Sequence, residues 1–219
     1  MIMENIKLGR LHKADERDMK FLLKSVVEPS DRTYRYWWAN GWWGDQGSTP
    51  QCVAYSWTHW LEDGPVTQKG SAPIIDCKYL YDEAQKVDEW EGTDYDGSSV
   101  RAGAKVLKSE GFIEEYRWAF DVDTLVNTLL EKGPVVVGTW WTSDMFFPNS
   151  KGIIKYTGSK AGGHAYILNG VNRSTGLIRL KNSWGKSWGS KGYAYISIDD
   201  MAKLLADDGE ACLATEIKK

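Results

Sequence analysis

The stretch GWWGDQGSTPQCVAYSW, residues 41–57, places a cysteine just behind a proline and at the head of an amphipathic run. Ser48 or Thr49 is a suitable N-cap and Pro50 suits the first helical position, so a helix is predicted to begin close to Pro50 and to stop at residues 64–65. Spacing of i, i+4, i+7 and i+8 predicts its buried stripe, which consists of Val53, Trp57, Trp60 and Leu61.

Composition describes an ordinary globular chain. It has 219 residues, of which 42% are hydrophobic and 26% charged, with a net charge of −3, enough for one large domain or two small lobes. The absence of a basic cluster argues against a nucleic-acid or anionic-membrane partner. No stretch has the length of a membrane span, and the first twenty residues lack the apolar core of a secretory signal.

Cysteine usage indicates free thiols. There are three cysteines, Cys52, Cys77 and Cys212, and no signal peptide is recognised. An odd number of cysteines in such a chain is typical of a reducing compartment. We therefore expect a cytoplasmic protein without a disulfide framework, and a monomer.

The first half of the chain is predicted to be helical and the second half to be mostly strands. Residues 1–36 are polar and form a lead-in, the N-terminal arm, before a main domain over residues 37–219. Further helices are predicted over 76–87, 98–110 and 123–132. The short segments PVVVGTWW, HAYILNGV, GLIRLKN and GYAYISI are predicted strands. This segregation predicts an α+β fold, with a helical lobe over about 48–132 and a β lobe over about 133–219.

Cys52 is a candidate nucleophile because it lies off the apolar stripe, in the first turn of its helix. Unpaired N–H groups and the helix dipole favour a thiolate there, so a lowered pKa is expected. Among three histidines, His12 lies in the polar arm and His59 lies about 10 Å along the same helix, out of reach. His164, in GGHAYILNG, remains as the base.

Two amides complete the candidate site. Asn182, in KNSWGKSWGSKGY, is positioned to accept the second N–H of the imidazole, with Trp184 covering that bond. Gln46, six residues before Cys52, can stabilise the oxyanion that acyl transfer creates.

Together these segments resemble the papain-like cysteine peptidases. DQGSTPQCVAYSW is similar to the oxyanion-glutamine and nucleophile segment, GGHAYILNG to the histidine strand, and KNSWGKSWGSKGYAYI to the asparagine motif with shielding tryptophans Trp184 and Trp188. The resemblance implies a two-lobed fold, in which a helical lobe packs against an antiparallel β-barrel-like lobe with the cleft between them. It further implies a Cys-His-Asn thiol peptidase, expected to be an endopeptidase, that needs no cofactor or metal and takes a peptide or protein substrate.

The resemblance also implies substrate contacts. Asp96 and Gly97 match the segment that binds the substrate backbone. The two shielding tryptophans, Trp184 and Trp188, are also expected to contribute to substrate binding. Gly138, Gly163 and Ala165 match the pocket for the residue preceding the scissile one, where small residues suggest room for a bulky apolar side chain.

Departures from the family pattern point to a compact bacterial or bacteriophage-type member. Thr49 replaces the upstream disulfide cysteine, leaving Cys77 without its usual partner, and Val53 replaces the tryptophan after the nucleophile. Two alternatives stay open. One is an amidase or acyl-transfer enzyme with the same machinery, and the other is a non-catalytic peptide-binding module of this fold.

Overall fold

The computed structural model of this protein describes residues 6–39, 42–63, 65 and 74–216. Its α-helices are α1 (Cys52–Glu62), α2 (Cys77–Val87), α3 (Val100–Ser109), α4 (Val122–Glu131) and α5 (Ile198–Ala206), and its 3-10 helices are η1 (Glu16–Lys20), η2 (Leu23–Ser25) and η3 (Ser143–Phe146). The first four α-helices lie within two residues of their predicted positions. The last one, α5, was not predicted.

The strands form an antiparallel sheet. They are β1 (Tyr34–Tyr36), β2 (Ile113–Ala119), β3 (Val135–Thr142), β4 (Lys160–Asn172), β5 (Leu177–Lys181), β6 (Tyr193–Ser197) and β7 (Glu210–Glu216). Their order is β2-β7-β3-β4-β5-β6, with β1 paired to β4. The sheet is not closed, so the expected barrel-like lobe is an open, twisted sheet. The four predicted strands are found, whereas β1, β2 and β7 were missed.

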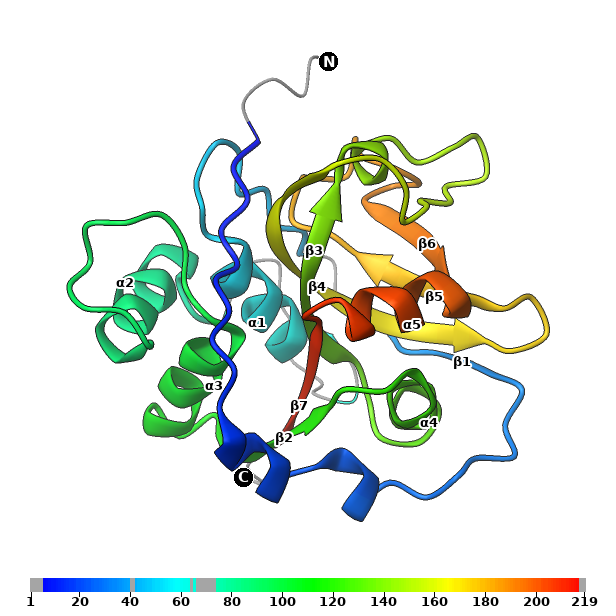
Figure 1. The fold of residues 1–219 in the computed structure, drawn as a ribbon, viewed down its shortest axis with the longest axis horizontal. Coiled ribbons are helices and arrows are strands. Elements are labelled where there is room, and N and C mark those ends of the chain that lie inside the picture. The colour runs from blue at the N-terminus through cyan, green and yellow to red at the C-terminus, as the bar shows by residue number, and fades with distance from the viewer. Residues whose placement is uncertain (1–5, 40–41, 64, 66–73, 217–219) are drawn as a thin grey trace.

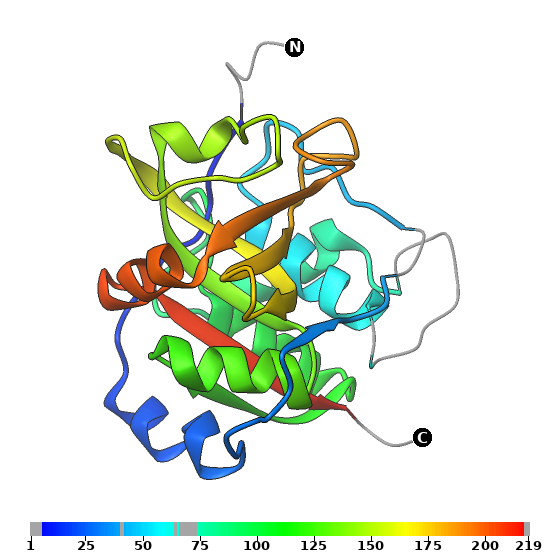
Figure 2. The same cartoon turned by 90° about the vertical axis from the view of Figure 1, so that its right-hand side faces the viewer.

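Two hydrophobic cores share the central strands. Val135 and Val137 of β3 belong to a core with α4 and α5, and Val136 between them belongs to a second core with Trp57 of α1. This alternation follows from the period of two along a strand. Figures 1 and 2 show α1, α2 and α3 gathered on one side of β3 and β4, with α4 and α5 on the other. The predicted α+β fold is confirmed, whereas α4, which was predicted within the helical lobe, packs in the same core as α5.

The helix of the opening stretch starts later than expected. It begins at Cys52, and its N-cap is Gln51, which makes no side-chain capping bond. Residues before it form a turn instead, in which the Thr49 N–H donates to the Gln46 carbonyl and the Gln46 side chain donates to the Thr49 carbonyl. The Thr49 hydroxyl, a predicted capping group, also donates to the Gln46 carbonyl at 2.6 Å.

The N-terminal arm packs on both lobes. Its β1 extends the sheet beside β4, and the Trp118 N–H of β2 donates to the Phe21 carbonyl. Upstream of η1, the chain runs in extended form along the junction of the lobes (Figure 1). None of the helices within the described ranges is long and apolar enough to cross a membrane.

Candidate active site

Cys52 is the first residue of α1, at the junction of the two lobes. Its Sγ accepts a hydrogen bond from the Ala165 N–H on β4 at 3.4 Å, and its side chain is 0% exposed. Burial raises the pKa of the Cys52 thiol to about 11, although the N–H groups of Ala165, Gly9 and Val53 act in the opposite direction. The lowered pKa expected from the helix terminus is therefore wrong for this covered state, because desolvation outweighs the backbone donors.

His164 and Asn182 are brought together by the pairing of β4 with β5. His164 Nε2 lies 2.9 Å from Asn182 Oδ1, and the Ser183 N–H donates to the same oxygen at 2.8 Å. The Ser183 donor fixes Oδ1 as an acceptor, so Nε2 carries the imidazole proton and Nδ1 is the free base. Nδ1 is buried without a hydrogen-bond partner among the described residues. Burial lowers the pKa of His164 to about 4, opposed by the bond to Asn182.

An aromatic shield encloses the histidine. Trp184 stacks on the His164 ring with centroids 4.8 Å apart, and Trp141 meets that ring edge-on at 4.9 Å. Trp188 packs edge-on against Trp184 and donates its indole N–H to the Phe146 carbonyl. Trp184 and Trp188 are both buried beside the histidine, as the shielding role expects, and their role in substrate binding stays a prediction.

Gln46 is placed to hold a carbonyl oxygen. Its Oε1 accepts a hydrogen bond from the Ser183 hydroxyl at 2.6 Å, which orients the amide. Its Nε2 donates to the Thr49 carbonyl at 2.8 Å and to the Lys7 carbonyl at 3.0 Å. The Lys7 carbonyl oxygen is thus one of two acceptors that the Gln46 amide nitrogen contacts.

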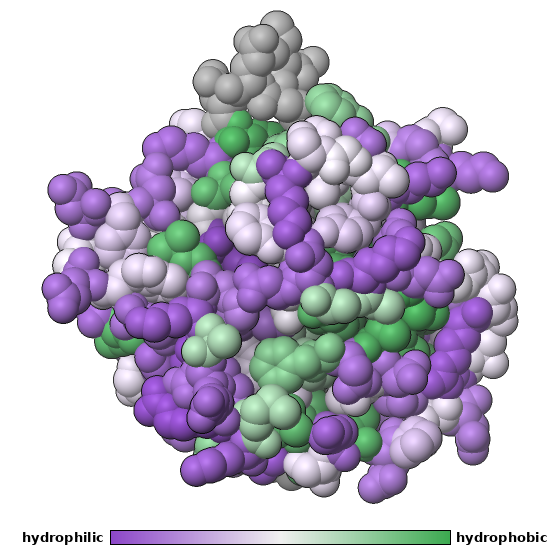
Figure 3. All heavy atoms as spheres, viewed as in Figure 1, coloured by the Kyte–Doolittle hydropathy of each residue, from purple (hydrophilic) through white to green (hydrophobic). Residues whose placement is uncertain are grey.

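The carbonyl belongs to residues 7–12 of the arm, which we call the crossing segment. The Arg10 N–H donates to the Gly163 carbonyl at 3.0 Å, and the Ser98 N–H donates to the Gly9 carbonyl at 2.9 Å. A further bond, from the Leu11 N–H to the Ser98 carbonyl, completes a short parallel bridge. The segment therefore bonds to both lobes. The face of the molecule along which it runs carries mostly hydrophilic side chains (Figure 3).

Gly9 is the residue of the crossing segment that packs most closely against Pro50, in the loop before α1. A Cβ at this position would lie 2.0 Å from the Pro50 carbonyl oxygen, so any other residue would push the segment away. Gly97 has φ of +108° and a Cβ there would lie 2.5 Å from the Gly9 carbonyl oxygen. Glycine at both positions lets two backbones pass each other beside Cys52.

The predicted substrate contacts lie around the crossing segment. The exposed Asp96 pairs with Lys7 Nζ at 2.7 Å. Gly163 adjoins Arg10, and Ala165 lies opposite Gly138 in the β3–β4 ladder. The segment bonds to the backbone of Gly163, a predicted residue, and to that of Ser98, which lies one residue beyond the predicted pair of Asp96 and Gly97 and which sequence reasoning missed.

The floor of the predicted apolar pocket is a carboxylate. Glu210 is 2% exposed and accepts two hydrogen bonds from Arg10, from Nε at 3.2 Å and from Nη2 at 3.1 Å. Burial raises the pKa of Glu210, opposed by Arg10 and by His12. Sequence reasoning missed both Arg10 and Glu210. The signal that could have drawn attention to Arg10 is the run Leu-Gly-Arg-Leu at residues 8–11, in which bulky side chains flank a glycine within an otherwise polar arm.

The two other histidines have different roles. His12 Nδ1 lies 2.7 Å from Asp208 Oδ1, at the rim of this pocket. His59 is buried and accepts a hydrogen bond from the Gly44 N–H at 3.1 Å, while burial lowers its pKa well below the usual value. His59 is therefore a structural residue, in agreement with its exclusion as the base.

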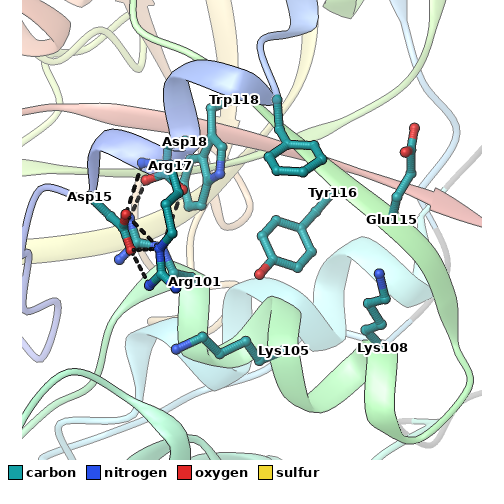
Figure 4. A pocket seen from close by; sticks show the side chains of 10 residues that line it. Asp15, Arg17, Asp18, Arg101, Lys105, Lys108, Glu115, Tyr116 and Trp118 are labelled. Carbon is teal, nitrogen blue, oxygen red and sulfur yellow. Dashed lines mark hydrogen bonds and ion pairs between the residues drawn. The ribbon is translucent and has the colours of Figure 1, made fainter.

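The arm is also anchored away from Cys52. Arg101 of α3 pairs with Asp18 of η1 and, at 3.2 Å, with Glu89. Figure 4 shows Arg101 beside the acidic side chains of the arm, at one end of a cavity of about 290 Å³ that Tyr116 and Trp118 also line. The cavity contains none of the candidate catalytic residues. Within the described chain, no group of three metal-ligating side chains converges.

Known proteins resemble this chain in sequence and fold. The family model "Papain family cysteine protease" matches residues 43–208. Cysteine proteinase 15A of Pisum sativum is 25% identical over 194 residues, which cover 68% of this chain and 52% of the pea protein. The chain thus spans about half the length of that curated relative. All three cysteines are free and buried.

Solved structures share the fold at low sequence identity. Xylellain, a cysteine protease from Xylella fastidiosa, superposes with a TM-score of 0.71 at 17% identity, covering 100% of both chains. The Carica candamarcensis cysteine protease CMS1MS2, solved in complex with E-64, has a TM-score of 0.66 at 16% identity, covering 85% of this chain and 100% of that one. The fold is thus papain-like, and the family match extends over most of the chain: it belongs to the papain family of cysteine proteases.

Proposed function

We propose that this protein is a cysteine-type endopeptidase that hydrolyses peptide bonds through Cys52, His164 and Asn182. The observation that carries the proposal is that the site already holds an extended peptide. Gln46 donates to the carbonyl of Lys7, and the Gly9 backbone passes beside Cys52. A peptide substrate would use the same donors and the same cleft.

The expected reaction follows from the positions of these groups. His164 Nδ1 takes the thiol proton, and the Cys52 thiolate attacks the peptide carbonyl. Gln46 Nε2 and the Cys52 backbone N–H stabilise the oxyanion. His164 then protonates the departing amine, and water attacks the thioester to release the acid and restore the thiol. Asn182 holds the imidazole in the tautomer that leaves Nδ1 free.

We further propose that the chain is latent while the crossing segment is in place. In a substrate, the residue in the Gly138 pocket would precede the residue whose carbonyl is attacked. Here Arg10 fills the pocket but follows Lys7, whose carbonyl accepts from Gln46. The segment thus runs in the reverse direction and blocks the cleft without presenting a bond for cleavage. Both Cys52 and His164 are 0% exposed beneath it.

The test uses the full chain carrying Gly9→Val and Arg10→Ala, which we call the arm-lifted chain. Valine at position 9 would collide with Pro50, and alanine at position 10 removes the side chain from the pocket. E-64, followed by peptide mapping, is expected to label Cys52 and neither Cys77 nor Cys212, and labelling is expected to stop cleavage of a mixed peptide library. An uncleaved library, or equal labelling of the three thiols, would reject the peptidase.

The same library separates the alternatives. Transfer of the acyl group to an added amine in preference to water would support the acyl-transfer enzyme. Tight binding of library peptides without any cleavage would support the binding module. The intact catalytic set and the oriented His164–Asn182 pair favour hydrolysis.

Asn182→Ala in the arm-lifted chain is expected to lower kcat by about tenfold to a hundredfold with little change in KM. Loss of a hydrogen bond to a group that becomes charged costs about 1.5–3 kcal/mol. Since Asn182 acts through the imidazole, the acidic limb of the pH–kcat profile is expected to shift as well. Asn149→Ala, in an exposed turn, is the matched control, and an unshifted profile with unchanged kcat would exclude the positioning role.

A further inference from the structure

The Glu210 pocket, which Val100, Gly138, Gly163 and Glu210 line, is occupied by a basic side chain of the chain itself. We propose that this pocket selects a substrate arginine, with lysine second, at the residue preceding the scissile one, and that Glu210 is the specificity-determining residue. The inference rests on the proposed peptidase function and names its substrate class.

The first argument is the geometry of the Arg10 guanidinium. Its Nε and Nη2 both donate to Glu210 Oε1, and Nη2 also donates to the Asp208 carbonyl at 2.7 Å. The side chains of Arg10 and Glu210 are each 2% exposed. A planar guanidinium fits this set of acceptors better than a compact ammonium, because its donors have a fixed fork geometry.

The second argument is the shape of the pocket. A Cβ on Gly138 would lie 2.8 Å from Arg10 Nε and 3.1 Å from Glu210 Oε1. The missing side chain therefore opens the path from the cleft to the carboxylate. A Cβ on Gly163 would also crowd the Arg10 side chain, at 3.3 Å from Cδ. The small residues expected to admit an apolar side chain admit a long basic one.

The third argument concerns what remains when the crossing segment leaves. Glu210 stays on β7 at the floor of the pocket, and its charge loses the cation that compensates it. A substrate arginine restores the ion pair, whereas a leucine would cover the carboxylate without satisfying it, which is unfavourable. Main-chain groups for the peptide are at hand, because Gly163 and Ser98 already bind the backbone around Arg10.

The experiment measures hydrolysis of fluorogenic amides acetyl-Ala-Xaa-Ala in the arm-lifted chain, with Arg, Lys, Leu, Phe or Glu as Xaa. The expected kcat/KM for Arg exceeds that for Leu by at least about tenfold. Glu210→Gln is expected to lower this Arg-to-Leu ratio by about tenfold to a hundredfold. The ratio is taken within each variant, so a partly unfolded sample lowers both terms and cancels.

Asp199→Asn is the matched control, because it removes the same charge from an exposed position of α5 outside the pocket. A change below about threefold in the ratio is expected, since an exposed charge is screened by water. An equal fall in both variants would assign the preference to the net charge of the chain and overturn the role of Glu210.

Binding separates this inference from the proposed function. The Cys52→Ala form of the arm-lifted chain is expected to bind the Arg peptide at least about tenfold more tightly than the Leu peptide. If it does so while the Cys52 form cleaves no peptide, the peptidase proposal fails and the pocket assignment stands. If peptides are cleaved and Leu or Phe is preferred to Arg, the pocket assignment fails and the peptidase stands.

Discussion

Gly9→Val is expected to raise the rate at which iodoacetamide alkylates Cys52 by at least about a hundredfold at neutral pH. Burial raises the pKa of the Cys52 thiol from 9.0 to about 11. Those two pKa units alone correspond to about a hundredfold in the thiolate fraction, and access to the reagent adds to it. Because a Cβ at Gly9 would lie 2.0 Å from the Pro50 oxygen, valine there lifts the crossing segment and exposes the thiol.

The pH dependence of the alkylation rate should show in which direction the pKa of Cys52 is shifted. A raised thiol pKa means that the thiolate is scarce at neutral pH, so the alkylation rate of the native chain is expected to keep rising beyond pH 10. In Gly9→Val this rise moves to lower pH. Ala14→Val introduces the same side chain at an exposed position of the arm and should leave the rate unchanged. Equal rates in the native chain and in Gly9→Val would show that the segment does not protect Cys52.

Elements with a strong local signal could be predicted from the sequence. The α1 stripe is visible in its spacing, and β3 and β4 contain apolar runs bounded by glycine or asparagine. α5 also had such a signal, because Ser197 caps it and Met201, Leu204 and Leu205 follow at helical spacing. That helix could have been predicted and was missed. By contrast, β2 and β7 carry charged and small residues, and their strand character depends on the pairing of β7 with β2 and with β3.

The candidate catalytic residues could be predicted because each lies in a short motif. Their electrostatic state could not, since it depends on what covers them. The helix terminus favours a thiolate at Cys52, but burial raises the pKa of its thiol, and one of the N–H groups that contact it, that of Gly9, lies more than forty positions earlier. A contact of this sequence separation leaves no local pattern.

The Glu210 pocket illustrates the same limit. Small residues at Gly138 and Ala165 give the width of the pocket but not its polarity. The polarity comes from β7, close to the end of the chain, and from Arg10, close to its start. Only the pairing of β3 with β7 brings Glu210 opposite Gly138. The sequence thus predicts the size of the pocket, whereas its acidic character depends on the strand pairing.

A second large effect is expected for the buried ion pair that supports the strand before Asn182. Lys181 Nζ lies 2.8 Å from Asp63 Oδ1, and both side chains are 0% exposed. Asp63 Oδ2 also accepts from Asn169 Nδ2 at 3.1 Å, so the carboxylate joins the end of α1 to β4 and β5. Asp63→Ala is expected to lower the free energy of unfolding by about 3–5 kcal/mol, because it leaves a buried ammonium without its partner.

The sign of the pH dependence identifies the cause. Burial lowers the pKa of Lys181 even beside Asp63, and without that partner the folded state favours the neutral amine more strongly. The unfolded chain still binds the proton below about pH 10.4, so the stability of Asp63→Ala should rise as pH increases toward that value. Adding Lys181→Met removes the buried charge and should recover most of the loss, as measured by urea unfolding. If the double variant is no more stable than Asp63→Ala, or if the loss is independent of pH, the unpaired lysine is not its cause and Asp63 acts through packing at the end of α1.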